Sequence, residues 1–338
     1  MRVAVVGAGQ ACAPHLQSLR DMDKELELAR VVARSADKLA ALDLPAGTLI
    51  STRLEDILED PTIQAVLVLT PPNTHLDIVQ RLASAGKHVL VEKPLDVTLG
   101  KAQQLVETCE QSDVKLAVML QHRMREASLA LAQLVKDGTM GQLLSASASI
   151  RWWRPQSYYE EAGRGTMARD GGGVLMTQAI HTLDLLLCLT GMPDRVFALA
   201  STSAAHRMEC EDTVVAVLHY PSGAIGNIDA TTAAYPGFPE RIALNFENGS
   251  ATLEAGELQA ELLDGRKIQA GIKQATGSGA NLMAFDHAFH RALLQDFVNA
   301  VRNNTEPRVT GRSALQAQRL IAALMESSTR GSAVSIAP

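Results

Sequence analysis

The sequence predicts an α/β fold: an N-terminal doubly wound parallel sheet, followed by an α+β domain with a large open sheet that is mixed or antiparallel. Over residues 3–121, short apolar runs alternate with segments of helical period, the pattern of a parallel sheet wound with helices. From residue 142 onward, longer β-like stretches are separated by hairpin-type turns. The length of 338 residues exceeds a single typical core, so two domains are expected.

The first domain contains five apolar runs that predict strands, at residues 3–6, 26–32, 65–69, 88–91 and 116–120. Helices are expected between them near residues 11–21, 36–42, 54–58, 74–85 and 98–111, several of them opened by Ser, Asp or Asn. We place the boundary after residue 121, which gives a domain of residues 1–121 and a second of residues 122–338.

The second domain begins with a predicted helix near residues 128–136 and a turn at residues 137–138. Strands are expected around residues 142–154, 196–200, 213–220, 224–232, 241–246 and 251–253. The glycine-rich segment 271–279 predicts a mobile loop. Two helices near residues 285–302 and 313–328 close the chain and are candidates for packing back on the first domain.

The composition is that of an ordinary globular protein, with 46% hydrophobic and 20% charged residues. The net charge of −6 arises from mixed acids and bases, so nucleic acid and membrane surfaces are not expected as partners. The four cysteines are far apart and lack metal-ligand spacing, so no metal site is expected. A strand from Val3 leaves no room for a signal peptide and no apolar run approaches ~20 residues, which predicts a cytoplasmic protein.

A glycine-rich turn, GAGQAC at residues 7–12, follows the first strand and precedes a helix. Gly7 and Gly9 stand where a tight turn and a close approach to a pyrophosphate require them. The helix N-terminus favours phosphates through its free N–H groups and partial positive charge. We therefore expect Gly7, Gly9, Gln10 and Ala11 to bind a dinucleotide in a Rossmann-type domain. Cys12 replaces the usual third Gly or Ala but is small enough to pack.

The end of the second strand bears on the choice between NAD and NADP. An acidic residue there would accept the ribose hydroxyls of NAD, and this chain has Ala33 instead. Arg34 and Ser35 offer a cation and a hydroxyl to a 2′-phosphate, so NADP is favoured over NAD. Arg34 also fits a solvated residue at the start of a helix.

Two further strand ends carry motifs: TPPNTH at residues 70–75 and EKP at residues 92–94. Together with GGGVLMTQAIHTLD at residues 171–184, they make the chain resemble the Gfo/Idh/MocA family of sugar and polyol oxidoreductases over essentially its whole length. The resemblance implies hydride transfer between NADP or NAD and a secondary alcohol or ketone of a sugar, polyol or inositol-like substrate. It also implies a homodimer or homotetramer that pairs through the open sheet.

The two proline-containing loops follow parallel strands at the edge where such sheets bind ligands. Thr70, Pro71, Pro72, Asn73 and His75 are expected to line the nicotinamide pocket, with Asn73 capping the next helix; a plain strand-to-helix turn explains the same residues.

The EKP segment is expected to contact both cofactor and substrate. Pro94 forces Lys93 into an extended conformation and allows a cis bond before it. The resemblance implies that Glu92, Lys93 and Gln121 contact the cofactor, and that Lys93 also binds the reacting oxygen of the substrate. A lysine before a proline is also typical of an ordinary surface residue.

His181 lies on an expected helix after the glycines 171–173, with Thr177, Gln178 and Asp184 on its face. Imidazole titrates near neutrality and suits transfer of the hydroxyl proton, although one histidine on an apolar helix also fits a core position. Many family members have Asp where this chain has Thr177. Proton transfer therefore relies more on Lys93 or Asp184, and the general base stays open between Lys93 and His181.

Both tryptophans and two of the four tyrosines fall within residues 151–159. Sugar rings suit aromatic planes with Arg or Tyr donors, so Arg151, Trp153 and Tyr158 are expected in the substrate pocket with Thr177 and Gln178. The same segment also fits a strand leading to a dimer-interface loop.

One more substrate-binding residue and two alternative functions follow from the resemblance. Arg123 matches a position where family members have a substrate-facing side chain. A glycoside hydrolase that uses NAD for transient oxidation is one alternative function. A non-catalytic dinucleotide-binding redox sensor is the other.

Overall fold

A computed structural model describes residues 1–9, 11–275, 277–279 and 286–337. The chain forms two compact units, which are treated separately below. Unit 1 consists of Met1–Gln121 with Asp286–Leu315, and unit 2 of His122–Phe285 with Gln316–Pro338. Residues 286–315 therefore group with the N-terminal part of the chain. Gln10, for which we predicted a cofactor contact, lies outside the described residues.

Unit 1 contains a six-stranded sheet in the order β3-β2-β1-β4-β5-β6, with all neighbouring strands parallel. Its strands are β1 (Arg2–Val6), β2 (Glu27–Val32), β3 (Leu49–Ser51), β4 (Ala65–Val68), β5 (His88–Val91) and β6 (Leu116–Val118). This order confirms the predicted doubly wound sheet, which binds ligands where the strand order reverses. The strand β3 was not predicted because it is short and its side chains are largely exposed.

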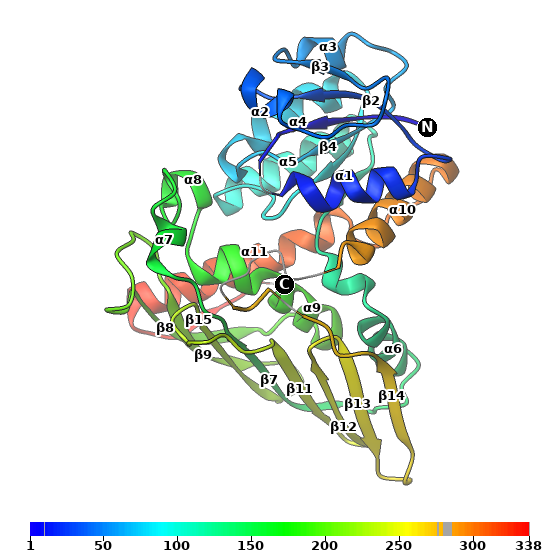
Figure 1. Ribbon diagram of the computed structural model, residues 1–338. Helices are drawn as coiled ribbons and strands as arrows, with labels where there is room; N and C mark the ends of the chain where they lie inside the picture. The colour runs from blue at the N-terminus through cyan, green and yellow to red at the C-terminus, as the bar shows by residue number, and fades with distance from the viewer. Residues whose placement is uncertain (10, 276, 280–285, 338) are drawn as a thin grey trace. The chain divides into compact units, whose positions relative to one another are not determined.

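The helices of unit 1 follow the strands as the sequence predicts (Figure 1). They are α1 (Cys12–Asp21), α2 (Ala36–Ala40), α3 (Glu55–Leu58), η1 (Pro72–Thr74), α4 (His75–Ser84), α5 (Leu99–Gln111) and α10 (Ala288–Asn303). Although α10 comes near the end of the chain, it packs against α1. The next segment reaches β6, where the N–H of Val118 donates to the carbonyl of Val309 at 3.1 Å. Unit 1 is thus completed by residues close to the C-terminus.

Unit 2 contains a nine-stranded sheet in the order β14-β13-β12-β11-β7-β10-β9-β8-β15. Its strands are β7 (Leu143–Arg151), β8 (Arg195–Ser201), β9 (Thr213–His219), β10 (Ile225–Thr231), β11 (Arg241–Phe246), β12 (Gly249–Glu254), β13 (Glu257–Leu262), β14 (Lys267–Gly271) and β15 (Val334–Ser335). The central pair β7 and β10 runs parallel, while the other neighbouring strands described are antiparallel. The predicted large mixed sheet is confirmed, with β13, β14 and β15 in addition.

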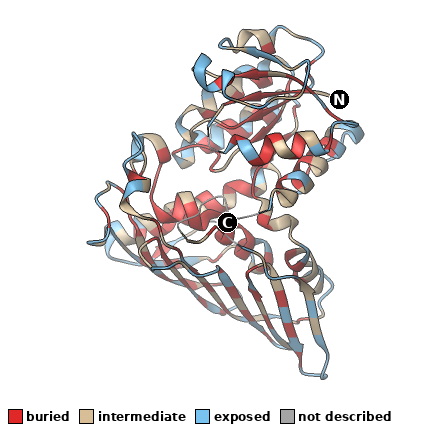
Figure 2. Ribbon diagram, viewed as in Figure 1, coloured by how far each residue is buried: buried red, intermediate tan, exposed pale blue. Residues whose placement is uncertain are grey.

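Helices cover one face of this sheet and leave the other open. They are η2 (Gln121–Met124, which begins in unit 1), α6 (Glu126–Lys136), α7 (Gln156–Tyr159), α8 (Met167–Asp170), η3 (Leu175–Ala179), α9 (Ile180–Thr190) and α11 (Gly311–Arg330, shared with unit 1). The helix α9 packs on β7, and α6 packs along β12 to β14. Buried and exposed residues alternate along the strands (Figure 2), because successive side chains point to opposite faces.

The helical stretch Met167–Thr190 is the single one in the described part of the chain that is long and apolar enough to cross a membrane, with a mean hydropathy of 1.4. The stretch is interrupted by Arg169, Asp170 and Asp184, so it is not a continuous apolar run of the kind considered from the sequence. Because 83% of its most apolar window is buried inside the structure, the stretch is placed as a core helix. Core helices meet the same criteria of length and composition.

The loop after β14 was predicted to be mobile, and its described end contacts Arg154. The Arg154 guanidinium donates to the carbonyls of Gly277 and Gly279, both at 2.8 Å. The backbone N–H of Trp153 also donates to Ser278 at 2.8 Å. Residues 277–279 are thus contacted by a buried cation that the sequence gave no reason to place there, and the mobility of segment 271–279 stays a prediction.

Candidate active site

The glycine turn after β1 has the shape that a dinucleotide pyrophosphate requires. Gly7 has a φ of +119°, and a Cβ on it would lie 2.7 Å from the carbonyl oxygen of Leu69. Only glycine avoids both the strain and the clash. A Cβ on Gly9 would meet nothing within 4 Å, so the space beside it is open. Ala11 begins α1, whose first turn has no acidic residue to repel a phosphate. The turn therefore fits the predicted group.

The end of β2 presents Arg34 to solvent, with Ala33 half-buried beside it. The hydroxyl of Ser35 accepts the N–H of Lys38 at 3.3 Å and thereby caps α2. Ser35 thus caps a helix, whereas the Arg34 side chain is exposed to solvent at the end of β2.

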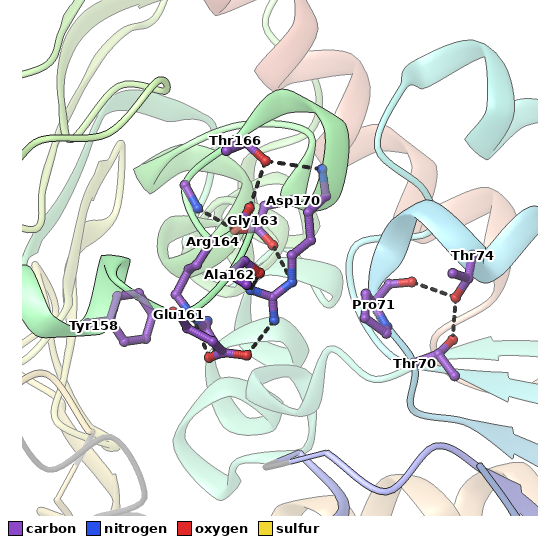
Figure 3. Close-up of polar contacts among 12 residues, drawn as sticks. Thr70, Pro71, Thr74, Tyr158, Glu161, Ala162, Gly163, Arg164, Thr166 and Asp170 are labelled. Carbon is purple, nitrogen blue, oxygen red and sulfur yellow. Dashed lines mark hydrogen bonds and ion pairs between the residues drawn. The ribbon is translucent and has the colours of Figure 1, made fainter. Parts of the chain in front are cut away.

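The TPPNTH loop is held by its threonines, not by Asn73. The Thr74 hydroxyl donates to the Pro71 carbonyl at 2.8 Å and to the Thr70 hydroxyl at 2.7 Å (Figure 3). Asn73 is exposed within η1, and Thr74 occupies the N-cap of α4 without a side-chain cap. The expectation that Asn73 caps this helix is wrong, because the 3-10 turn after Pro71 moves the helix start beyond it.

His75 does not line a cofactor pocket as we predicted. Its side chain is fully buried, with Nδ1 3.0 Å from the Pro94 carbonyl oxygen and Nε2 2.8 Å from that of Thr70. The ring therefore ties the TPPNTH loop to the EKP loop. Pro71 and Pro72 remain partly exposed at the carboxyl edge of the sheet.

Glu92 forms the centre of a buried cluster that the sequence did not reveal. One carboxylate oxygen lies 2.7 Å from His15 Nε2 on α1, and the other accepts the N–H of Lys93 at 3.1 Å. His290 on α10 packs edge-on against His15 with ring centroids 5.3 Å apart. Burial opposes ionisation of Glu92, but the hydrogen bond and charge of His15, with the charges of Lys93 and His290, hold its pKa at about 2.

This cluster offers two imidazoles and a carboxylate, with donor atoms within 4.8 Å of one another. Tetrahedral zinc at its usual bond lengths separates its ligand atoms by about 3.3 Å. The 2.7 Å between His15 and Glu92 is instead a charge-assisted hydrogen-bond distance. The cluster therefore anchors the EKP loop by hydrogen bonding. Lys93 follows directly, half-buried, and the Lys93–Pro94 peptide bond is cis.

The last predicted cofactor residue of unit 1, Gln121, lies just after β6 at the start of η2. It is half-buried, and its side-chain oxygen has no protein hydrogen-bond partner within the described ranges. This unsatisfied acceptor lies buried at the carboxyl edge of the sheet.

In unit 2, a carboxylate binds the backbone at the start of the segment that carries His181. Glu211 accepts the N–H of Gly173 at 2.9 Å and that of Leu175 at 3.2 Å. A Cβ on Gly173 would lie 1.7 Å from the Glu211 carbonyl oxygen, so the close approach requires glycine. The π-helical turn η3 then leads into α9, and such turns occur often at functional sites.

His181, buried near the start of α9, stacks on the ring of His122. The ring centroids are 4.9 Å apart and the planes are inclined by 29°. Four residues before His181, the Thr177 hydroxyl donates to the Gly173 carbonyl at 2.7 Å and also to the side-chain oxygen of Gln178. The Gln178 amide in turn reaches the Tyr158 hydroxyl at 3.4 Å. Thr177 therefore connects to a polar chain that leads toward Tyr158.

Asp184 and Arg123 are bound to each other. Arg123 Nε donates to Asp184 at 2.7 Å, and its NH2 group donates to the second carboxylate oxygen. Burial opposes the charge on Arg123, but the bonds to Asp184 and its charge raise the guanidinium pKa above its usual value. Each of the two side chains is engaged by the other, so we no longer assign Asp184 to proton transfer or Arg123 to substrate. The sequence could not reveal this contact across 61 residues.

The residues of the aromatic segment 151–159, which begins at the end of β7, do not all lie on the same face of the sheet. Arg151 is exposed and pairs with Asp229 of β10 at 2.6 Å. It alternates with Ile150, which is buried, so it lies on the sheet face opposite α9 and His181. The expectation of Arg151 in a substrate pocket is therefore wrong. Trp153, in contrast, continues past the strand and packs edge-on against Tyr235 with ring centroids 5.6 Å apart.

Tyr158 and Arg164 form a polar group (Figure 3). Arg164 donates to the Tyr158 hydroxyl at 2.7 Å and lies over its ring at 4.3 Å. Glu161 pairs with Arg164 and also with Arg169, the latter at 2.7 Å. Asp170 also lies 3.8 Å from Arg169, so two carboxylates balance these two guanidinium groups.

The comparisons agree with this arrangement. Residues 1–120 match an oxidoreductase family with an NAD-binding Rossmann fold, and residues 128–252 match the GFO/IDH/MocA C-terminal domain. Myo-inositol 2-dehydrogenase of Thermotoga maritima is 27% identical over 94% of this chain and 93% of its own. The scyllo-inositol 2-dehydrogenase (NADP(+)) of Bacillus subtilis is 26% identical over 59% of this chain and 54% of its own.

Solved structures extend the likeness to the whole chain. The WlbA dehydrogenase from Bordetella pertussis, in complex with NADH and UDP-GlcNAcA, is 28% identical and has a TM-score of 0.84. The match covers 100% of this chain and 99% of that one.

Proposed function

This chain belongs to the Gfo/Idh/MocA family and is an NAD(P)-dependent oxidoreductase acting on CH–OH groups, and we propose that its substrate is a sugar, polyol or inositol-like molecule. The reaction would move hydride between the nicotinamide and a secondary alcohol or its ketone. The observation that carries the proposal is that one chain contains both an open glycine turn, in unit 1, and a stacked, buried His181, in unit 2.

The cofactor would be held by the glycine turn and the carboxyl edge of the first sheet. Gly7 keeps the turn tight, and Gly9 leaves the space that a pyrophosphate fills. Pro71, Pro72 and Gln121 present partly exposed groups at the same edge. When bound, the nicotinamide supplies or accepts the hydride. Because Arg34 is exposed at the end of β2 and Ala33 brings no carboxylate there, we favour NADP, with NAD as the alternative.

Lys93 and His181 would handle the hydroxyl proton. Glu92 fixes the Lys93 backbone through its N–H, so the ammonium extends from an anchored loop. An ammonium can bind the reacting oxygen and stabilise the negative charge that develops on it. His181 would accept the proton in oxidation and return it in reduction, since imidazole exchanges protons near neutral pH. Glu92 itself serves as an anchor in this scheme.

The substrate would be recognised by polar and aromatic groups of unit 2. Gln178 and Thr177 form a connected chain that leads to the Tyr158 hydroxyl. Hydroxyl groups of a sugar or inositol match this alternation of donors and acceptors. The indole of Trp153 offers an apolar plane of the kind that stacks on sugar C–H faces.

The test is a panel of inositols, hexoses and nucleotide-linked sugar acids, assayed with each coenzyme by nicotinamide absorbance. Lys93→Met and His181→Asn are expected to lower kcat at least about 100-fold while coenzyme binding, measured by fluorescence, is retained. Failure of either coenzyme to bind, or wild-type turnover in both variants, would overturn the proposal.

Two alternatives give different results in the same assay. A hydrolase with transient oxidation would release free sugar from a glycoside with no net change in coenzyme absorbance. A dinucleotide-binding sensor would bind coenzyme but turn over none of the panel. Both alternatives are excluded by net coenzyme reduction that depends on His181.

We also propose that two copies pair through the open face of the nine-stranded sheet. Apolar side chains of three neighbouring strands are exposed there, namely Phe197, Leu199, Val215, Val217 and Ile225. Contiguous exposed apolar surface of this kind marks association sites. Light scattering should give a dimer or tetramer, and Val217→Lys should dissociate it. A monomeric wild-type protein would overturn this part.

A further inference from the structure

We propose that His122 is a positioning residue for His181: a neutral imidazole, fixed by the Arg125–Glu240 ion pair, that holds the His181 ring in place by stacking. The inference rests on the proposed role of His181 in proton transfer. His122 is not part of any motif singled out in the sequence.

The stacking contact is close and enclosed. His122 in η2 is 6% exposed and His181 in α9 is 8% exposed, so neither ring is free to turn into solvent. Their centroid separation of 4.9 Å and shallow interplanar angle are those of stacked rings. Because η2 and α9 are separate elements, the stack fixes the His181 ring plane from outside its own helix.

Arg125 determines the protonation state of His122. Its NH2 group lies 2.8 Å from His122 Nε2. A guanidinium has donors but no acceptor, so His122 Nε2 must accept and carries no proton. The single ring proton is then on Nδ1, and the imidazole is neutral. A protonated His122 would bring its N–H donor against those of Arg125 and would leave two positive charges beside the single Glu240 carboxylate, 4.0 Å from His122 Nε2, in a buried site.

Glu240 keeps Arg125 in this position. Its carboxylate accepts from Arg125 NH1 at 2.6 Å, and its side chain is 6% exposed. The second oxygen, Oε2, has no protein partner among the described residues, and neither has the Thr182 hydroxyl. Both residues line a cavity of about 20 Å³. This volume holds one water molecule, which would satisfy both buried groups.

The stack on His122 orients the His181 ring, which neither Thr177 nor Asp184 of the same helical segment does. Thr177 stands where many members of the family carry an acid, and its hydroxyl is engaged by the Gly173 carbonyl and Gln178. Asp184, the other acid of the segment, is bound to Arg123. Ring orientation by a carboxylate on the same helix is therefore replaced by a stacked imidazole. That imidazole is held by Arg125, whose partner Glu240 directly precedes β11, far along the chain.

The direct test is the tautomer of His122, read from ¹⁵N-labelled protein without substrate. Wild-type protein at neutral pH should show one protonated and one bare nitrogen on the ring. In Glu240→Gln, Arg125 loses its ionic partner, and the signal of the bare nitrogen should move. A doubly protonated His122 in the wild type would overturn the proposal whatever the enzyme does.

Activity provides the second readout. Glu240→Gln and His122→Ala should lower kcat about 10- to 100-fold with little change in the KM for coenzyme, because a misplaced reacting group loses rate rather than binding. His122→Phe, which keeps a flat ring, should retain more kcat than His122→Ala. Ser128→Ala, in the same cavity wall, should change neither value.

The outcomes separate this inference from the proposed function. Wild-type kcat in a folded His122→Ala protein overturns the positioning role. Full activity in His181→Asn overturns the proposed function and, with it, the role of His122 in catalysis. The measured tautomer of His122 would still establish the protonation state of this imidazole. Thermal melting of each variant shows that a lost rate comes from a folded protein.

Discussion

The carboxylate of Asp184 receives two hydrogen bonds from the guanidinium of Arg123, and the Asp184 side chain is 1% exposed. Two charges in a buried site are stable only together, because removing one leaves the other without compensation. The pair therefore joins η2 to α9, the two elements that also carry the stacked His122 and His181.

The first prediction concerns this pair. Arg123→Met should destabilise the protein by about 3–5 kcal/mol, since Asp184 is left buried and unpaired. The double variant Arg123→Met, Asp184→Leu should recover most of that loss. Urea unfolding monitored by circular dichroism measures both. A single variant as stable as the wild type would show that the ion pair does not form.

The glycine turn provides a pair of matched variants. Gly7→Ala should unfold unit 1 or lower its melting temperature sharply, because the new methyl meets the Leu69 carbonyl at 2.7 Å. Gly9→Ala should fold normally, since no atom lies within 4 Å. It should nevertheless weaken coenzyme binding at least tenfold, because the methyl occupies space proposed for the pyrophosphate. Equal coenzyme affinity in Gly9→Ala and wild type would place the cofactor elsewhere.

Acid should destabilise unit 1 through the cluster beneath the EKP loop. Burial, with the nearby charge of His15, lowers the pKa of His290 to about 3. The unfolded chain binds this proton below about pH 6.5, whereas the folded chain resists it until about pH 3, so stability falls as pH drops through that window. Glu92, with its pKa lowered to about 2, adds a loss below about pH 4.5.

One proton taken up only by the unfolded chain corresponds to about 1.4 kcal/mol per pH unit. His290→Leu should therefore flatten the dependence of unfolding free energy on pH between about 6 and 4, as measured by urea titration at each pH. The control is His219→Gln, which removes a partly exposed histidine from the surface of unit 2. An unchanged slope in His290→Leu would contradict the cluster.

The preference for NADP over NAD should depend on the residues at the end of β2. Ala33→Asp places a carboxylate where it repels a 2′-phosphate and accepts ribose hydroxyls. The ratio of kcat/KM for NADP to that for NAD should fall at least about tenfold in this variant, and Arg34→Gln should lower it as well. Steady-state kinetics with both coenzymes provides the measurement. A ratio unaffected by either change would show that the ribose lies elsewhere.

Much of unit 1 was predictable because its information is local. Each buried strand of the parallel sheet is a continuous apolar run, and the turn at Gly7 and the loop at Pro71 are short motifs with fixed conformations. The sheet of unit 2 was also predicted, because alternation and hairpin turns are local signals. The short, exposed strand β3 gave neither kind of signal.

The partners of the site residues were not predictable, because they come from distant parts of the chain. His15 meets Glu92 across 77 residues, and Arg125 meets Glu240 across 115. Nothing in local periodicity selects one partner among several candidates. For the same reason Arg123 was assigned to substrate, when its actual partner is an acid on another helix.

The order in which the elements are synthesised also matters. The central strand β7 pairs with β10 and β11, whose partners in the register lie about 80 to 100 residues later, and unit 1 still requires α10 and residues 309–310. Neither unit can complete its hydrogen bonding until most of the chain has left the ribosome. Nascent chains should therefore expose apolar strand edges for a long time and depend on chaperones during synthesis.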